Sequence, residues 1–214
     1  MQKDIFEELM EWKNCTECEI GKTAYRHVLF DTIPKRKHTV DVLFIGEGPG
    51  QSENTMGRPF IGRSGRLLRA AIKSANEDID LVIGITNLVA CRPCDTITSG
   101  NRPPSDTEVR NCRDRLHLTI RLLKPKVLIA LGNVPGRWVE NFNKEWLLTY
   151  HKLYHPSFIL RNGSTVGTMY EKYVEDIKDI FEDVSKEKEE SSARVRESSS
   201  IPSAVLESLW RRSN

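Results

Sequence analysis

The chain has 214 residues, 38% of them hydrophobic, and 32 basic against 30 acidic side chains give a formal charge of +2. This size allows one sizeable hydrophobic core, and the near balance of charge excludes nucleic-acid binding by bulk charge alone, so anion recognition must be local. No apolar segment approaches the length of a membrane span and no signal peptide opens the chain, so we expect a soluble, intracellular protein without a membrane partner.

Helical and strand-like segments alternate along the chain. Apolar residues at helical spacing predict helices at residues 2–13, 65–75, 105–123, 133–142 and 170–184. Short runs rich in branched residues predict strands at residues 40–46, 81–89 and 126–132, and residues 146–157 are expected to form a strand or an extended segment that runs into a loop. Ser105 stands three residues before Glu108, the spacing of a capping box, and opens the third helix. We therefore expect an α/β fold, a three-layer α/β/α sandwich with a central, mostly parallel four-stranded sheet.

The composition changes beyond Val184. Residues 185–200, "SKEKEESSARVRESSS", offer almost nothing to bury, so we expect a disordered linker there. The spacing of the apolar residues in the last segment, 201–214, predicts a short amphipathic helix. This helix either folds back on its own domain or docks on a protein partner. The globular domain is therefore expected to span residues 1–184.

Six glycines and two prolines lie within "GEGPGQSENTMGRPFIGRSG", residues 46–65, directly after the first predicted strand. Ligands of open parallel sheets bind beyond the carboxyl ends of the strands, and glycines there let a ligand approach the backbone closely. The spacing does not match a dinucleotide-binding GxGxxG, and no Gly-Lys-Ser/Thr of a P-loop follows. An ordinary tight turn explains Gly48 and Gly50 but not the second glycine cluster around Phe60.

Five cysteines form two CxxC pairs with one residue left over. Cys15 with Cys18 and Cys91 with Cys94 would complete a four-thiolate zinc site, leaving Cys112 unused. In a chain of this kind, metal ligands are a more natural interpretation than disulfides.

The glycine-rich stretch resembles the first motif of the family 4, iron–sulfur uracil-DNA glycosylases, which belong to the uracil-DNA glycosylase superfamily. Three further segments, "ITNLVACRP", "GNRPPSDTEVRNC" and "YHPSFILR", are similar to later motifs of that family and follow in the same order. The resemblance implies a monofunctional hydrolase that flips uracil out of DNA and cleaves its N-glycosidic bond, which initiates base excision repair. We expect a monomer acting in the cytoplasm, the nucleoid or the nucleus.

The resemblance also implies roles for individual residues. His155 would donate to a base oxygen as the bond breaks, and Glu47 would orient water or contact the base, with nearby main-chain donors supplying much of the catalysis. Asn87 presents one donor and one acceptor, which match the O4 and N3–H of uracil and oppose cytosine. Phe60 would stack on the base. Gly48 stands where the family usually has alanine, which leaves room for a 5-substituted uracil as an alternative substrate.

DNA contacts are expected beside these residues. After the His-Pro pair, Ile159 or Leu160 would act as the apolar wedge in the vacated base stack. Arginines are expected to contact phosphates along the same rim. These are Arg58, Arg63, Arg66 and Arg161.

The family pattern pairs the cysteines differently from the CxxC spacing. It implies a [4Fe–4S] cluster held by Cys15, Cys18, Cys91 and Cys112 in a structural role. Cys94 falls in "CDTITS", which looks like an insertion, and remains the rival fourth ligand, with zinc as the alternative metal. A different class of function also stays open, namely a non-catalytic, metal-bearing module that binds DNA or a partner.

Overall fold

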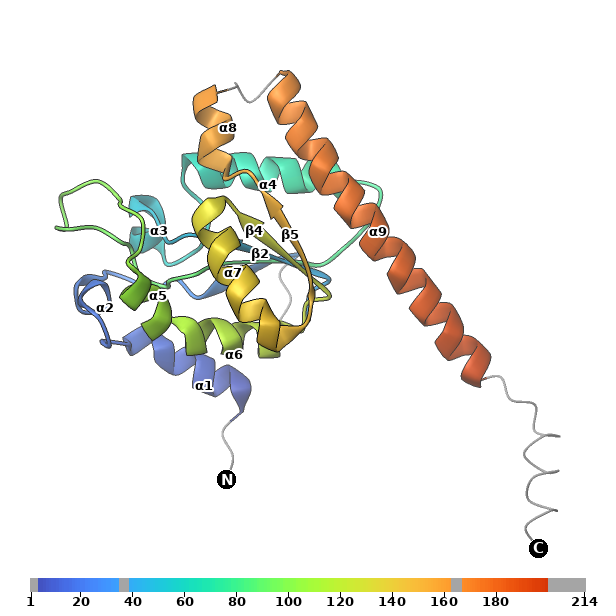
Figure 1. Ribbon diagram of the computed structural model, residues 1–214, viewed down its shortest axis with the longest axis horizontal. Coiled ribbons are helices and arrows are strands. Elements are labelled where there is room, and N and C mark those ends of the chain that lie inside the picture. Colours follow the sequence, from blue (N-terminus) through green and yellow to red (C-terminus); the bar gives the residue numbers. More distant parts are fainter. Residues whose placement is uncertain (1–3, 35–38, 163–166, 200–214) are drawn as a thin grey trace, which may run out of the picture.

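The computed structural model describes residues 4–34, 39–162 and 167–199. Five strands form one sheet in the order β1-β3-β2-β4-β5 (Figure 1). Only β1 runs antiparallel to its neighbour, and the other pairs are parallel. The strands are β1 (Phe30–Ile33), β2 (Val42–Gly46), β3 (Ile83–Asn87), β4 (Val127–Leu131) and β5 (Thr149–Leu153).

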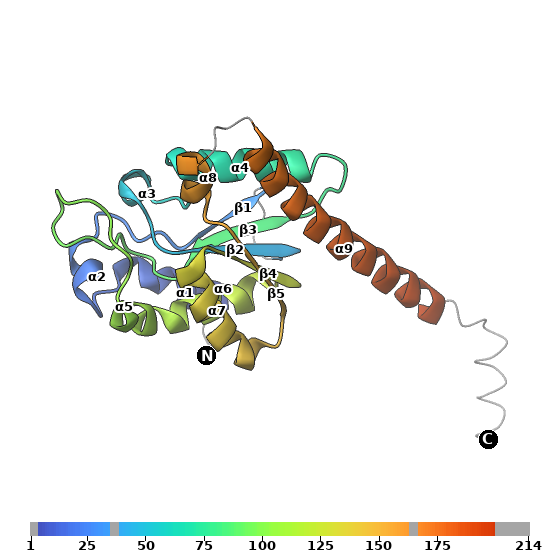
Figure 2. The same ribbon diagram turned by 45° about the horizontal axis from the view of Figure 1, so that its top comes forward.

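Helices cover both faces of the sheet, as Figure 2 shows. One face packs on α1 (Ile5–Glu11), α6 (Arg113–Leu123) and α7 (Asn133–Trp146). The other packs on α4 (Arg63–Ala75), α8 (Pro156–Asn162) and α9 (Thr168–Ser199). The remaining elements are the 3-10 helix η1 (Trp12–Asn14) and the short helices α2 (Glu19–Thr23), α3 (Gln51–Met56) and α5 (Asp106–Asn111). The α/β class and its three layers are therefore confirmed.

The buried strands follow from simple alternation of side chains. In β2, Leu43 and Ile45 enter one core cluster, whereas Val42 and Phe44 enter the other. Successive side chains of a strand point to opposite faces, so a strand buried on both faces must be apolar throughout. The capping box is also present, because Glu108 N donates to Ser105 Oγ and Ser105 N donates to the Glu108 carboxylate.

The expected number of strands was wrong, because β1 adds a fifth strand at the edge of the sheet. This segment has only four residues, "FDTI", and two of them are polar. Such a short mixed run lacks the apolar pattern on which strand prediction depends. Its pairing with β3 brings Asp31 toward the glycine-rich segment, which matters for the site below.

Helix α9 continues to Ser199 and so passes through the segment expected to be a disordered linker. The structure thus places residues 185–199 in a helix, where a disordered linker was expected. Lys186 pairs with Asp183 within the helix, and Lys188 pairs with Asp41 of the body at 3.0 Å. Glutamate, lysine and alanine favour helices, and such ion pairs add support that a search for apolar residues does not detect.

Two further expectations concern the C-terminal part of the chain, namely the end of the globular domain at residue 184 and a helix at residues 201–214. Val184 is the last residue of α9 in the buried core. The terminal helix expected at residues 201–214 lies outside the described residues. Within the described part of the chain, no helix is both long enough and apolar enough to cross a membrane.

Candidate active site

A cavity of about 800 Å³ opens at the carboxyl ends of β2, β3 and β4. Its wall comes from both halves of the glycine-rich stretch, the end of β3, the segment at residues 93–103, the turn after β4 and the start of α8. The residues expected to bind the base or to act on it all lie in this wall. They are Glu47, Gly48, Phe60, Asn87 and His155.

Gly46 explains part of the glycine-rich pattern. It lies opposite Asn87 in the β2–β3 register. A Cβ at this position would stand 2.4 Å from Asn87 Oδ1 and 2.4 Å from Phe60 Cζ. Both distances are well below van der Waals contact, so the glycine lets the amide and the aromatic ring meet beneath the cavity.

We expect Gly46→Ala to lower both stability and activity. Overpacking of a tight site costs about 1–3 kcal/mol, and displacement of a positioned side chain by about 1 Å lowers rates on the order of 10²-fold. Thermal unfolding and turnover of the substrate proposed below would measure the two effects. Gly100→Ala is the matched control, because a Cβ at Gly100 meets nothing within 4 Å. Equal behaviour of the two variants would contradict the argument.

Phe60 is held in an unusual backbone conformation. Its φ of 52° lies in the left-handed region, which bulky side chains rarely adopt. Gly65 allows the turn, because a Cβ there would stand 2.1 Å from the Phe60 carbonyl carbon. The Phe60 ring lies 6.4 Å from the imidazole of His155, at an angle of 39°. The Phe60 ring and the His155 imidazole thus border the same cavity.

Two anchors that sequence analysis missed hold this segment. The buried carboxylate of Glu53 accepts hydrogen bonds from the backbone N–H groups of Gly50, Ile61 and Gly62, at 2.7–3.1 Å. It therefore joins the two glycine clusters. The only signal in the sequence is the position of Glu53 three residues after Gly50, at the start of α3.

The second anchor begins on β1. Asp31 pairs with Arg69 at 2.8 Å, and Arg69 Nε donates to the Phe60 carbonyl at 2.8 Å. Arg58 pairs with the same carboxylate at 2.9 Å and is absent from the cavity wall. Burial raises the pKa of Asp31, but hydrogen bonds from Arg58 and Arg69 lower it on balance. Arg58 thus pairs with Asp31 while half of its side-chain surface stays exposed, so its contact to a phosphate remains a prediction.

Asn87 ends β3 with its side chain almost fully buried. Its Oδ1 has no hydrogen-bond partner among the described residues. Arg115 lies beneath it and is fully buried, donating to the carbonyls of Asn87 and Leu88 at 2.6 and 2.7 Å and to Thr86 Oγ1 at 2.9 Å. The arginine fixes the backbone at the strand end and leaves the amide free. No motif in the sequence marks Arg115 for this role.

His155 follows β5 and precedes α8. Ser157 N donates to its Nδ1 at 3.1 Å, and Ser157 Oγ lies 2.8 Å from the same nitrogen. Because Nδ1 accepts, the neutral ring carries its proton on Nε2. Burial, and secondly the charge of Arg161, lowers the pKa of His155 to about 4. The imidazole is therefore neutral at physiological pH.

Gly132 makes room for this histidine. Its φ is 98°, and a Cβ there would stand 3.1 Å from the Cβ of His155. The turn after β4 therefore needs glycine for its conformation and for the close approach of the ring.

Glu47 and Gly48 follow β2. Burial raises the pKa of the Glu47 carboxyl above its usual range. A Cβ at Gly48 would stand 2.9 Å from the Pro93 ring and 3.0 Å from Val89. The space left by the missing methyl group is thus taken up by Pro93 and Val89. This corrects the expectation that Gly48 leaves room for a 5-substituent.

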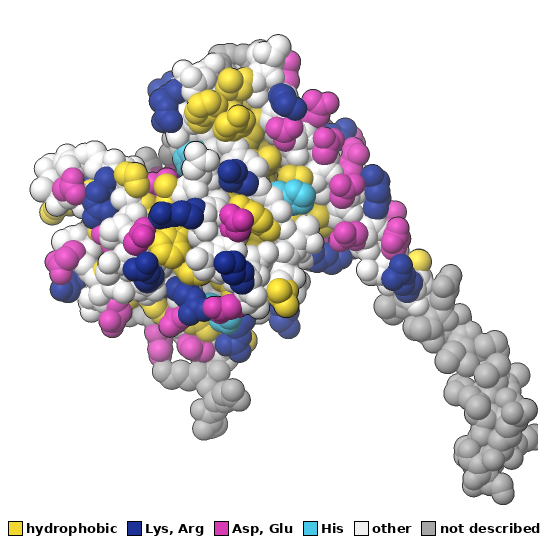
Figure 3. Space-filling model, viewed as in Figure 1, with side chains coloured by type: hydrophobic (Ala, Val, Ile, Leu, Met, Phe, Trp, Pro, Cys, Tyr) yellow, Lys and Arg dark blue, Asp and Glu magenta, His cyan; other side chains and the backbone are white. Residues whose placement is uncertain are grey.

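The residues expected to contact DNA fall into two groups, those that line the cavity and those that do not. Arg63, Leu160 and Arg161 line the cavity. Ile159 is 1% exposed and belongs to the core between α8 and the sheet, so burial excludes it as the wedge. Arg66 donates to the Ile61 carbonyl at 3.3 Å and does not line the cavity. Figure 3 shows basic and acidic side chains interspersed over one face of the molecule, with hydrophobic side chains gathered over α8.

A second, small pocket lies beside the first, between α2 and the α5–α6 junction. Four cysteines line it: Cys15, Cys18, Cys91 and Cys112. Burial, and then its three neighbouring thiols, strongly raises the pKa of Cys91. Cys94 does not line this pocket, and its Sγ instead faces the Arg92 carbonyl at 3.6 Å. Among the described residues, no three His, Cys, Asp or Glu are grouped to hold a single metal ion.

These features agree with comparisons to known proteins. The sequence pattern of the Uracil DNA glycosylase superfamily matches residues 34–179. The chain is 33% identical over 141 residues to the type-4 uracil-DNA glycosylase of Archaeoglobus fulgidus, a match that covers 64% of this chain and 63% of that protein. It is 30% identical over 169 residues to that of Sulfurisphaera tokodaii, covering 70% and 72%. It is 32% identical over 181 residues to that of Thermotoga maritima, covering 74% and 86%. The resemblance is therefore confirmed, and the chain belongs to the uracil DNA glycosylase superfamily.

Proposed function

We propose that this protein is a monofunctional uracil-DNA glycosylase that initiates base excision repair inside the cell, in the cytoplasm, nucleoid or nucleus. One observation carries the proposal above the others. Among the described residues, the buried Asn87 Oδ1 has no hydrogen-bond partner, and it lies beside the Phe60 ring in a cavity that His155 also lines. Buried polar atoms without partners are rare and call for an explanation, and a bound base supplies one.

Uracil satisfies this amide. Its N3–H would donate to Asn87 Oδ1, and its O4 would accept from Nδ2. Cytosine presents the opposite pattern, a bare N3 and an N4 donor, and would leave the buried oxygen facing a lone pair. Phe60 would stack on the extruded base, since its backbone is fixed by Arg69 and its ring borders the cavity.

The reaction needs charge stabilisation more than proton transfer. As the N-glycosidic bond breaks, the sugar becomes cationic and the departing base anionic, and water then adds hydroxide to C1′ and a proton to the base. Nε2–H of the neutral His155 would donate a hydrogen bond to the base oxygen on which charge develops. Glu47 would orient the water or contact the base, with main-chain donors beside it. No lysine nucleophile is invoked, so the DNA strand stays intact.

Contacts to DNA come from the cavity rim. Leu160 would enter the vacated base stack, while Arg63 and Arg161 would contact phosphates. Removing a true phosphate contact should flatten the dependence of binding on salt. We expect the protein to act as a monomer.

Cys15, Cys18, Cys91 and Cys112 would hold a [4Fe–4S] cluster. The fit rests on the four cysteines that line one pocket. As thiolates they would repel one another, and the positive charge of the cluster would offset that repulsion. Four thiolates are also a ligand set for zinc, so zinc remains the alternative metal for this pocket. The proposed role of the cluster is structural, because it would join the segment before α2 to the loop after β3.

Two cysteine variants test this assignment. Cys112→Ala should lose the visible absorbance of the cluster and unfold at a temperature roughly 10 °C lower or more, since each kcal/mol shifts a domain of this size by about 2–4 °C. Cys94→Ala is the control and should keep both properties. Loss of the cluster in Cys94→Ala, with retention in Cys112→Ala, would reverse the assignment.

The pKa of His155 gives a further prediction. Its value of about 4 lies below the ordinary 6.5, so the folded protein binds fewer protons than the unfolded chain between these pH values. The contribution of His155 to the free energy of unfolding is therefore fully present above pH 6.5 and is lost as pH falls toward 4. An imidazole NMR titration, assigned with His155→Ala, should show a neutral Nε2–H ring at about pH 6. A midpoint near the ordinary value would contradict the burial argument, and Arg161→Gln should raise the midpoint.

The function itself is tested with labelled oligonucleotides that carry uracil or thymine at one site, followed by alkali to break abasic sites. Cleavage at uracil alone supports the proposal. Intact uracil DNA, in the presence of protein that holds its cluster, would overturn it in favour of a binding module. The base-recognising amide beside a histidine favours the enzyme, because a pure binding module has little use for this pair.

A further inference from the structure

The segment between β3 and α5 includes a part that neither base recognition nor catalysis explains. Its inner residues Pro93, Asn101 and Arg102 line the cavity. Its outer part, residues 94–100, forms a loop that projects at the left of Figure 1, beyond α3 and α5. The loop therefore starts and ends at the cavity wall and extends outward from it.

A buried arginine holds the loop from inside. Arg92 is 6% exposed, and its guanidinium donates to the carbonyls of Ile97 and Ser99 and to Asn101 Oδ1. Two of these acceptors belong to the loop, and the third, Asn101, follows it directly. A buried charge held by several acceptors orders the backbone that supplies them.

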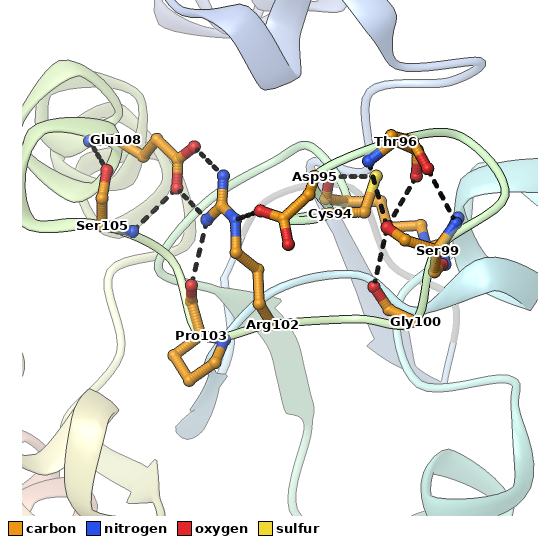
Figure 4. Close-up of polar contacts among 10 residues, drawn as sticks. Cys94, Asp95, Thr96, Ser99, Gly100, Arg102, Pro103, Ser105 and Glu108 are labelled. Atoms are coloured by element: carbon orange, nitrogen blue, oxygen red, sulfur yellow. Dashed lines mark hydrogen bonds and ion pairs between the residues drawn. The ribbon is translucent and has the colours of Figure 1, made fainter.

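A second set of bonds closes the outer turn, as Figure 4 shows. Thr96 N donates to Ser99 Oγ at 3.0 Å, and Ser99 N donates to Thr96 Oγ1 at 3.1 Å. Arg102 pairs with Asp95 at 2.9 Å and with Glu108 at 2.7 Å. These pairs neutralise the charges near the loop, so Arg102 is not free to hold a phosphate.

Ile97 stands on this ordered loop with 70% of its surface exposed. Single exposed aliphatic side chains are common and mean little by themselves. Here the side chain is presented by a loop whose conformation is held by the buried Arg92 guanidinium, and the residues on either side of that loop, Pro93 and Asn101, line the cavity. The only charged residue of the loop is Asp95, which is already paired. The loop is therefore suited to apolar contact with bases and not to phosphates.

We propose that Ile97 packs against the base stack of duplex DNA beside the extruded nucleotide, as a second apolar contact separate from Leu160 of α8. The inference rests on the proposed function, because it takes duplex DNA as the occupant of the rim. A duplex holds an ordered base stack on both sides of the vacated position, whereas a single strand stacks weakly, so the contact assists double-stranded substrate more than single-stranded substrate.

The test compares Ile97→Ala with wild type on a duplex carrying one uracil and on the same uracil strand alone. Loss of the contact should lower kcat/KM on the duplex about tenfold, with little change on the single strand. Ile97→Leu should restore most of the duplex activity. Leu147→Ala is the matched control, because Leu147 is 83% exposed at the far end of α7 and does not line the cavity.

Salt dependence separates this contact from a charged one. Ile97→Ala should keep the wild-type slope of duplex binding against salt, whereas Arg161→Ala should flatten it. Wild-type duplex activity in Ile97→Ala, or an equal loss on single strands, would overturn the inference while the proposed function stands. Inactivity of the wild-type protein on both substrates would instead overturn the proposed function.

Discussion

Replacing His155 by alanine is expected to lower kcat on uracil-containing DNA about 10²–10³-fold, with little change in substrate binding. The imidazole is neutral, and Ser157 fixes its proton on Nε2. A neutral donor of this kind acts mainly when negative charge develops on the departing base. The loss should therefore appear in single-turnover rates and not in the affinity for uracil DNA.

The control for this variant is His151→Ala, since His151 lies on β5 outside the cavity wall. It should keep its activity. Glu47→Gln should reduce activity less than His155→Ala, because main-chain donors near Glu47 are proposed to carry much of the stabilisation. An equal loss in Glu47→Gln would show that the carboxylate is more important than proposed.

Asn87→Ala is expected to lower kcat/KM for uracil about 10²–10³-fold without destabilising the protein, because two hydrogen bonds to the base are lost. Its Oδ1 is buried and has no partner among the described residues, so truncation relieves a desolvation cost in the free protein. The unfolding temperature should therefore stay level or rise while activity falls. Most buried polar residues behave oppositely, since their removal breaks existing bonds.

Thr86→Ala provides a comparison at the preceding position. Thr86 is fully buried, donates to the Leu29 carbonyl and accepts from Arg115. It should lose stability, because its removal leaves a carbonyl and a buried guanidinium with one partner fewer. Destabilisation of Asn87→Ala to the same extent would show that its amide supports the fold, and would weaken the case for a base at this site.

The distribution of apolar residues predicted most of the fold. Strands β2, β3 and β4 are buried on both faces, so their residues are mostly apolar, with Thr86 and Asn87 at the end of β3 as polar exceptions, and such runs are visible without a structure. Strand β1 was missed because it is short and polar, and its identity depends on pairing with β3. The extension of α9 was missed because charged residues and ion pairs maintain it after the apolar pattern ends.

The motifs identified Glu47, Phe60, Asn87 and His155, and all four line the cavity. Choices between neighbours in the sequence needed the structure. Helix α8 turns Ile159 into the core and Leu160 toward the cavity, and the loop after β3 carries Cys94 away from the pocket that Cys112 lines. One residue along a helix rotates a side chain by about 100°, which composition does not reveal.

By itself, the sequence determined the α/β class, the position of the site at the carboxyl ends of the strands and the residue types available for uracil. Tertiary structure alone decided which side chains hold the residues of the site in place. Asp31 reaches Arg69 across 38 positions, and Arg115 reaches the Asn87 carbonyl across 28. Local patterns report which face of an element is buried. Contacts at such separations depend on the order of strands in the sheet, and no local pattern encodes that order.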